Sequence, residues 1–220
     1  GNFTIDSATG VLTFLNSPNF ESASDSDGNN TYVVGVSVSD GDGATLDVTQ
    51  TITVTVTDAN DAPVIEFGGV PYPGPVPVSM TEDGGAPFPW SAPPLSATDE
   101  DGDALTWSVS TLPSNGAASY SDSSDPSTLV YVPDGNYNGV DSFVVHVSDG
   151  ALTDTILVDV TVSPVADAPV ITSSDGNATS SISILENETA VVTVVAADGD
   201  GDAITFSKSG GVDAALFDLN

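Results

Sequence analysis

Apolar and polar residues alternate along much of this chain. In Thr51–Thr57, the apolar residues Ile52, Val54 and Val56 alternate with threonine. This period of two is typical of a half-buried antiparallel strand. The stretch Ile156–Val162 repeats the pattern, with Ile, Val, Val and Val expected to face inward. The same pattern predicts further strands at Gly10–Phe14, Tyr32–Ser39, Ala104–Ser110, Leu129–Val132, Ser142–Ser148, Ala190–Val195 and Ala203–Lys208.

The predicted fold class is all-β. Short strands are separated by turns rich in Gly, Asn, Asp and Pro, and no segment carries a helical apolar stripe. Such a chain forms antiparallel sandwiches. The 39% of hydrophobic residues suffices for packed cores, so we expect a folded chain despite its acidity.

A repeated motif divides the chain into domains. Asp61–Ile65 reads Asp-Ala-Pro-Val-Ile and returns as Asp167–Ile171, about one sandwich domain later. We therefore predict a complete domain at 64–168, the closing part of a domain at 1–63 and the opening part of another at 169–220. Consistent with this, Asn2–Asp6 is similar to Leu216–Asn220, so the chain spans just over one period of a two-domain unit.

The charge is extreme. Lys208 is the only Lys or Arg beside 32 Asp and Glu residues, and the formal net charge is −31. A compact chain of this charge repels itself and needs positive charge from outside. The absence of basic patches argues against nucleic acid and anionic membrane surfaces as partners. The chain has no cysteine, so an extracellular form cannot be stabilised by disulfides. A bound metal ion could stabilise it instead.

The carboxylates gather in short blocks, each beside an alternating strand. The blocks are Asp58–Pro63, Asp99–Asp103 and Asp198–Asp202. Close-set oxygen ligands of this kind suit Ca²⁺. An EF-hand loop is not indicated, because Ala104 and Ala203 break its register.

These motifs resemble cadherin repeats. Asp58–Pro63 is similar to the DxNDxAP linker, and the Asp-x-Asp pairs at 99–101 and 198–200 are similar to the internal DxD motif. The other matches are Phe20-Glu21 (end of DRE), Ser39-Asp40 and Ser148-Asp149 (AxD), and Glu82 and Glu186 (first-strand glutamate). Residues 64–168, with Tyr131–Phe143, resemble the bacterial cadherin-like tandem repeats of very large surface proteins. The resemblance implies tandem Ig-like, Greek-key, seven-stranded β-sandwiches, one complete and two partial, in an elongated rod.

The resemblance also implies Ca²⁺ at the domain junctions. For the first junction, the implied ligands are Glu21, Asp58, Asn60, Asp61, Asp99, Asp101 and Asp149. For the second they are Glu82, Asp167, Asp198, Asp200 and, through a neighbouring copy, Asp40, while Asp141 stands in for the missing DRE motif. Glu186 is the implied first-strand glutamate ligand of the 169–220 part. Pro164–Asp167 lacks the counterparts of Asp58 and Asn60, so we expect the second junction to bind fewer or weaker ions.

These observations predict a calcium-rigidified segment of an extracellular bacterial fibre or adhesin. It would serve as a spacer and scaffold in cell adhesion, with any secretion signal outside this window. Its partners would be neighbouring copies, head to tail, the 169–220 part of one unit and the 1–63 part of the next forming one composite domain, either within a longer chain or between subunits.

The alternative is a calcium-dependent carbohydrate-binding module for surface glycans. In that case Trp90 would be the exposed platform, while Trp107 is expected in the core. No enzyme is predicted, because the single His146 has no partner for a triad or zinc site.

Overall fold

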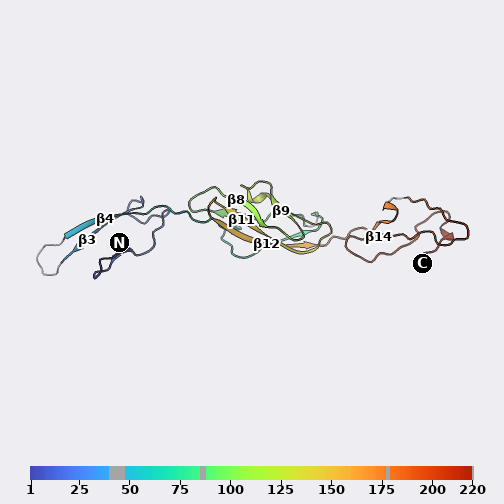
Figure 1. The fold of residues 1–220 in the computed structure, drawn as a ribbon, viewed down its shortest axis with the longest axis horizontal. Helices are drawn as coiled ribbons and strands as arrows, with labels where there is room; N and C mark the ends of the chain where they lie inside the picture. Colours follow the sequence, from blue (N-terminus) through green and yellow to red (C-terminus); the bar gives the residue numbers. More distant parts are fainter. Residues whose placement is uncertain (40–47, 85–87, 177–178, 220) are drawn as a thin grey trace. The chain divides into compact units, whose positions relative to one another are not determined.

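The computed structural model describes residues 1–39, 48–84, 88–176 and 179–219. Within these ranges the chain forms strands and three short 3-10 turns, and no helix is long and apolar enough to cross a membrane (Figure 1). The predicted all-β class is therefore confirmed. The strands are β1 Phe3–Ile5, β2 Leu12–Phe14, β3 Thr31–Val38, β4 Val48–Thr55, β5 Val64–Phe67, β6 Val76–Thr81, β7 Leu95–Thr98, β8 Thr106–Thr111, β9 Gly116–Tyr120, β10 Leu129–Pro133, β11 Gly139–Ser148, β12 Thr153–Ser163, β13 Val170–Ile171 and β14 Ala196–Ala197.

Two compact units make up the chain. Unit 1 comprises Gly1–Pro71, Ser96–Thr106 and Val147–Asp154, and unit 2 comprises Tyr72–Leu95, Trp107–His146 and Thr155–Asn220. The two units group residues that lie close together in space, and their limits are not those of the sequence repeats. The domains at 1–63, 64–168 and 169–220 therefore stay a prediction.

The main sheet of unit 2 has the strand order β6-β12-β11-β8. Its centre is β12, where Ile156, Val158, Val160 and Val162 are at most 4% exposed while the residues between them face outward. The inward face predicted from the alternation is thus confirmed. Strand β6 runs parallel to β12, with Val76 opposite Val158, and this pairing joins two segments that are far apart in the sequence.

A hairpin of β9 and β10 packs on this sheet through aromatic rings. Tyr131 of β10 stacks on Phe143 of β11 with ring centroids 5.8 Å apart, and Trp107 of β8 lies 6.3 Å from Tyr120 of β9. Tyr131, Phe143 and Trp107 are almost completely buried. The prediction that Trp107 belongs to the core is confirmed, and burial of such large rings contributes to the stability of this part of the fold.

The described residues of unit 1 form three two-stranded sheets, β1-β2, β3-β4 and β5-β7. The rings of Phe3, Phe14 and Tyr32 form its aromatic cluster, with centroids 4.4 to 6.1 Å apart. Tyr32 is buried, whereas Ile52 and Val54 of β4 are only half-buried. The side chains of β4 therefore alternate as predicted, but over a thinner core than in unit 2.

Two predicted strands are wrong. Residues 190–195 and 203–208 form no strand, and the described part of 169–219 contains only the short pair β13-β14. A strand needs a paired neighbour and an apolar layer to cover it. Here Val192 and Val195 are more than half exposed, so alternation alone does not order these residues.

Candidate metal centre

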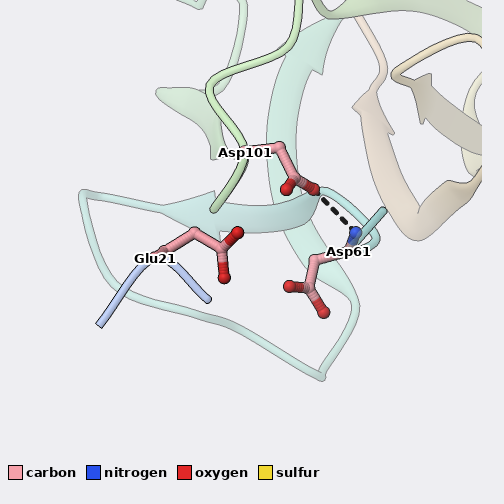
Figure 2. Close-up of side chains that lie close together, drawn as sticks. All are labelled: Glu21, Asp61 and Asp101. Carbon is pink, nitrogen blue, oxygen red and sulfur yellow. Dashed lines mark hydrogen bonds between the residues drawn. The ribbon is translucent and has the colours of Figure 1, made fainter. Parts of the chain in front are cut away.

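The first acidic cluster lies within unit 1. We call Glu21, Asp61 and Asp101 the Asp101 cluster, because one carboxylate oxygen of each lies within 4.8 Å of the others. Figure 2 shows the three side chains around one space. Two oxygens on one Ca²⁺ are at most about 5 Å apart, since each Ca–O bond is about 2.3–2.6 Å. The spacing therefore fits a shared cation.

The aspartates of the 99–101 motif each use one oxygen for the backbone and leave the other unsatisfied. Oδ2 of Asp101 accepts from the N–H of Asp61 at 2.7 Å, and Oδ1 of Asp99 accepts from the N–H of Asp103 at 3.1 Å. Among the described residues, Oδ1 of Asp101 and Oδ2 of Asp99 are buried with no hydrogen-bond partner. Buried unpaired carboxylate oxygens are costly, and a cation would remove that cost.

Carboxylate charges shift the pKa values in this cluster. Burial raises the pKa of Asp61, and so do the charges of Glu100, Asp101, Asp58 and Asp99. The pKa of Glu21 is also raised: its own backbone N–H lowers it, but burial and the charges of Asp101 and Asp58 outweigh that effect. These carboxylates therefore repel one another in the absence of an ion.

Asn60 and Asp149 also meet in unit 1. The amide of Asn60 donates to Oδ2 of Asp149 at 2.8 Å. The N–H of Ala151, the Asn60 amide and the N–H of Leu152 lower the pKa of Asp149. Asp149 is thus held as an anion beside the 58–61 linker, where the family resemblance expected it.

The second cluster lies within unit 2. We call Asp198, Asp200 and Asp202 the Asp200 cluster, with carboxylate oxygens again within 4.8 Å of one another. Asp198 organises the turn, because its Oδ1 accepts from the N–H groups of Asp200 and Asp202, both at 3.1 Å. Oδ2 of Asp200 accepts from the N–H of Asp167 at 2.7 Å, and its Oδ1 is buried without a partner. The bond from Asp167 to Asp200 repeats that from Asp61 to Asp101.

Glu82 and Asp167 belong to the same acidic region. Glu82 is only 5% exposed; its Oε1 accepts from the N–H of Val165 at 2.6 Å, whereas Oε2 is buried with no partner among the described residues. Burial raises the pKa of Asp167, and so do the charges of Asp83, Asp200, Glu82 and Asp198. A nearly buried, half-satisfied Glu82 beside other carboxylates indicates a missing positive charge.

Two of the predicted ligands, Asp141 and Glu186, lie outside both clusters. Asp141 is in neither cluster: its oxygens accept from the N–H groups of Ser114, Asn115 and Ser142 and from the hydroxyl of Tyr131. These bonds serve the core of unit 2, so the structure does not place Asp141 where the DRE motif was expected. Glu186 is exposed and outside both clusters. Asp40 lies outside the described residues.

The sequence reasoning also missed some carboxylates. Asp202 belongs to the 198–202 block and Asp83 follows Glu82 directly, but neither fits a motif of the family. Glu100 was missed as well; it lies between two predicted ligands and accepts from the amide of Asn19 at 2.8 Å. Their position in acidic blocks was the available signal, because all three residues lie within two positions of a predicted ligand.

The donors in both clusters are hard oxygens. The chain has no cysteine, and its one histidine, His146, contacts Ser108 at 3.2 Å. The only side-chain cation, Lys208, lies 3.8 Å from Asp218 at an exposed site. Carboxylate and amide oxygens fit Ca²⁺, whereas zinc sites usually contain Cys or His.

Comparison with known proteins identifies a domain within the chain. Residues 60–161, a little under half of the chain, match a family described as bacterial Ig domain. No curated protein matches the sequence. The match agrees with the strands of the fold: this part is an Ig-like all-β domain, as the resemblance to bacterial cadherin-like repeats predicted.

Several solved structures are similar at low identity. The protocadherin gammaB7 EC3-6 cis-dimer is 20% identical with a TM-score of 0.42, covering 92% of this chain and 49% of that chain. Human protocadherin-24 EC1-2 is 17% identical with a TM-score of 0.42, covering 74% and 77%. Endo-fucoidan hydrolase MfFcnA4 from glycoside hydrolase family 107 is 20% identical with a TM-score of 0.36, covering 96% and 30%. The chain spans about half the length of the first of these structures. We draw nothing about its activity from these similarities.

Proposed function

We propose that this chain is a calcium-binding structural segment of a bacterial extracellular surface protein. The observation that carries the proposal is the set of buried carboxylate oxygens without hydrogen-bond partners, on Asp99, Asp101, Asp200 and Glu82. They belong to two regions that combine carboxylates from distant parts of the sequence. The Ig-like domain at 60–161 supports an adhesion-type repeat, and no catalytic role is proposed.

Calcium would supply the charge that the chain lacks. In unit 1 the residues that would hold it are Glu21, Asp61 and Asp101, with Asp58 and Asp99 close enough for their charges to act on this group. The backbone N–H of Asp61 orients the Asp101 carboxylate. Binding would replace repulsion by attraction and fix the segments that carry these carboxylates, so that the chain can serve as a stiff spacer.

In unit 2 the corresponding residues are Glu82, Asp167, Asp198 and Asp200. The N–H groups of Val165 and Asp167 fix Glu82 and Asp200, respectively. Asp202 and Asp83 add charge that the family motifs did not predict. Pro164–Asp167 lacks the counterparts of Asp58 and Asn60. The extra carboxylates partly offset this loss of negative charge at the second site.

The proposal includes the repeat boundaries and head-to-tail assembly. Between 169 and 219, apolar side chains such as Leu185 and Leu216 are 78% and 81% exposed. Unit 1 has a hollow of about 550 Å³ lined by Phe3, Tyr32 and Val34, among others. We propose that the 169–220 segment of one copy completes the 1–63 segment of the next as one sandwich, within a longer chain or between subunits.

The test is a calcium titration of protein freed of metal by a chelator. A site with a Kd of about 0.1 mM gains about 2.7 kcal/mol at 10 mM Ca²⁺, and the thermal midpoint should rise by roughly 5–10 °C. Mg²⁺ should give a smaller rise, because it demands tighter octahedral geometry. Small-angle scattering should show a more extended molecule with Ca²⁺. Identical melting and scattering in Ca²⁺ and chelator would contradict the proposal.

A second candidate function is calcium-dependent carbohydrate binding. Trp90 lines a hollow of about 230 Å³ together with Glu82, Asp83 and Val132, among others. The ring is half-buried against Tyr131, and its Nε1 donates to the carbonyl of Leu129 at 2.9 Å, so it is a less open platform than predicted. Glycan-array binding in saturating Ca²⁺ that is lost in Trp90→Ala would favour this candidate.

A further inference from the structure

Gly199 is in close contact with two side chains of the second acidic region. A Cβ at this position would lie 2.4 Å from Oδ2 of Asp167 and 2.6 Å from Nδ2 of Asn136. The φ of Gly199 is not in the left-handed region, so the glycine is required here for space. The matching position of the 99–101 motif is Glu100. The two acidic regions are therefore built differently at their centres.

Asn136 is held toward this region by its own loop. It lies between β10 and β11 with φ at +59°, a conformation that Asn adopts more readily than most residues. The loop is closed by the N–H of Tyr137, which donates to the carbonyl of Asp134 at 3.0 Å. The carboxamide thus reaches Gly199 from a short, hydrogen-bonded turn, and Asn136 is solvent-exposed.

The second region lacks two oxygen donors that the first one has. Pro164 and Ala166 stand where the first linker has Asp58 and Asn60. Glu82 is nevertheless only 5% exposed, and its Oε2 is buried without a hydrogen-bond partner among the described residues. A bound cation would remove the cost of burying this oxygen. This buried oxygen is an observation separate from the approach of Asn136 to Gly199. The two observations meet at Asp167: the charge of Glu82 acts on it, and both its carboxylate and the Asn136 amide lie close to Gly199.

We propose that the carboxamide oxygen of Asn136 completes the cation site of Asp167 and Asp200, and that Gly199 is the residue that makes room for it. This inference rests on the proposed calcium function. An amide flip about χ2 brings Oδ1 to the place of Nδ2, and Ca²⁺ accepts amide oxygens as well as carboxylates. A neutral oxygen donor adds a ligand without adding repulsion to an already acidic region.

The experiment measures Ca²⁺ binding by calorimetry in the full chain, with Asp101→Asn as the background to weaken the first site. Asn136→Gly keeps the backbone free to adopt positive φ and removes the amide, and we expect Ca²⁺ affinity to fall about tenfold. Asn138→Gly, in the same loop, is the matched control and should bind like the background. Asn136→Asp restores an oxygen and should bind at least as tightly as the background.

Each outcome has one meaning. If Asn136→Gly binds Ca²⁺ like Asn138→Gly, the inference is wrong while the calcium function stands. If Asn136→Asp binds as weakly as Asn136→Gly, the amide acts as a hydrogen-bond donor to Asp167, and the ligand role is again wrong. If the unmodified chain binds no Ca²⁺, the proposed function itself fails, and this inference with it. Gly199→Ala should reproduce the loss seen in Asn136→Gly.

Discussion

The hydroxyl of Tyr131 donates to Oδ2 of Asp141 at 3.0 Å inside unit 2. Asp141 is 8% exposed and also accepts from three backbone N–H groups, those of Ser114, Asn115 and Ser142. It therefore ties the loop after β8 to the start of β11 and to β10. We expect Asp141→Ala to lower the free energy of unfolding by about 1–3 kcal/mol, because several buried donors lose their acceptor. Chemical denaturation in saturating Ca²⁺ measures this loss, and Asp159→Ala, exposed on β12, should change little.

The same residue predicts a dependence on pH. Burial raises the pKa of Asp141, but the hydrogen bonds from Ser114, Asn115, Ser142 and Tyr131 outweigh burial and hold it below its ordinary value. A group whose pKa is lower in the folded state stabilises the fold above its unfolded pKa, about 3.9. That contribution is lost as the pH falls through the folded pKa. The stability difference between the parent chain and Asp141→Asn should therefore shrink below about pH 4, and a difference constant down to pH 2 would contradict this reading.

Asp141 also shows where sequence reasoning reaches its limit. The family resemblance places Asp141 at the metal site as a stand-in for the missing DRE motif, but only the fold shows that four donors already surround it. By contrast, β12 could be predicted with its inward face, because alternation encodes burial directly. Strand β9, Gly116–Tyr120, was missed because it carries Gly, Ala and Ser and has no apolar alternation. Its pairing with β10 holds it as a strand.

The metal clusters were partly predictable for a related reason. The Asp-x-Asp motifs at 99–101 and 198–200 each supply members of a cluster: Asp198 and Asp200 lie together with Asp202, and Asp101 lies with Glu21 and Asp61. Asn136 has no such signal, since its approach to Gly199 depends on the course of a distant loop. At residues 190–195 the reverse holds. The alternating valines predict a strand, but no strand forms there, because no neighbouring strand in the described part of the chain pairs with them.

Neutralising one carboxylate of the Asp101 cluster should have opposite effects with and without calcium. Asp101→Asn keeps an oxygen to accept from the N–H of Asp61 but removes a charge that acts on Glu21 and Asp61. In chelator, repulsion falls, and the thermal midpoint should stay constant or rise. In Ca²⁺, the affinity of this cluster should drop about tenfold or more, because a charged ligand is lost. Asp213→Asn, exposed and outside both clusters, is the control; a lower midpoint for Asp101→Asn in chelator would contradict the repulsion.

The two clusters can be compared directly. Replacing Asp99 and Asp101 together by Ala removes both aspartates of the first motif, each with a buried unpartnered oxygen. Asp167→Ala removes one carboxylate of the second region and leaves Glu82, Asp198 and Asp200 in place. We expect the double variant to lose more of the calcium-induced rise in thermal midpoint than Asp167→Ala does. Equal losses, measured by calorimetric melting at fixed Ca²⁺, would mean that the two regions contribute alike.

Gly116 in β9 and Gly35 in β3 form a matched pair for testing how closely the strands pack. Neither has a positive φ, so each tolerates a side chain as far as the backbone is concerned. A Cβ on Gly116 would lie 2.5 Å from the carbonyl oxygen of Val132 in β10, whereas a Cβ on Gly35 would meet nothing within 4 Å.

Gly116→Ala must therefore push the β9-β10 hairpin apart, and Tyr131 of that hairpin stacks on Phe143 of the main sheet. We expect it to destabilise the fold by about 1–3 kcal/mol. Gly35→Ala should be neutral or stabilise by up to about 1 kcal/mol, since it restricts the unfolded chain without a clash. Near-ultraviolet circular dichroism, which reports the packing of Trp107 and Tyr131, should weaken only in Gly116→Ala. Equal stabilities of the two variants would show that the hairpin yields to a methyl group and that the aromatic layer of unit 2 does not depend on this close contact.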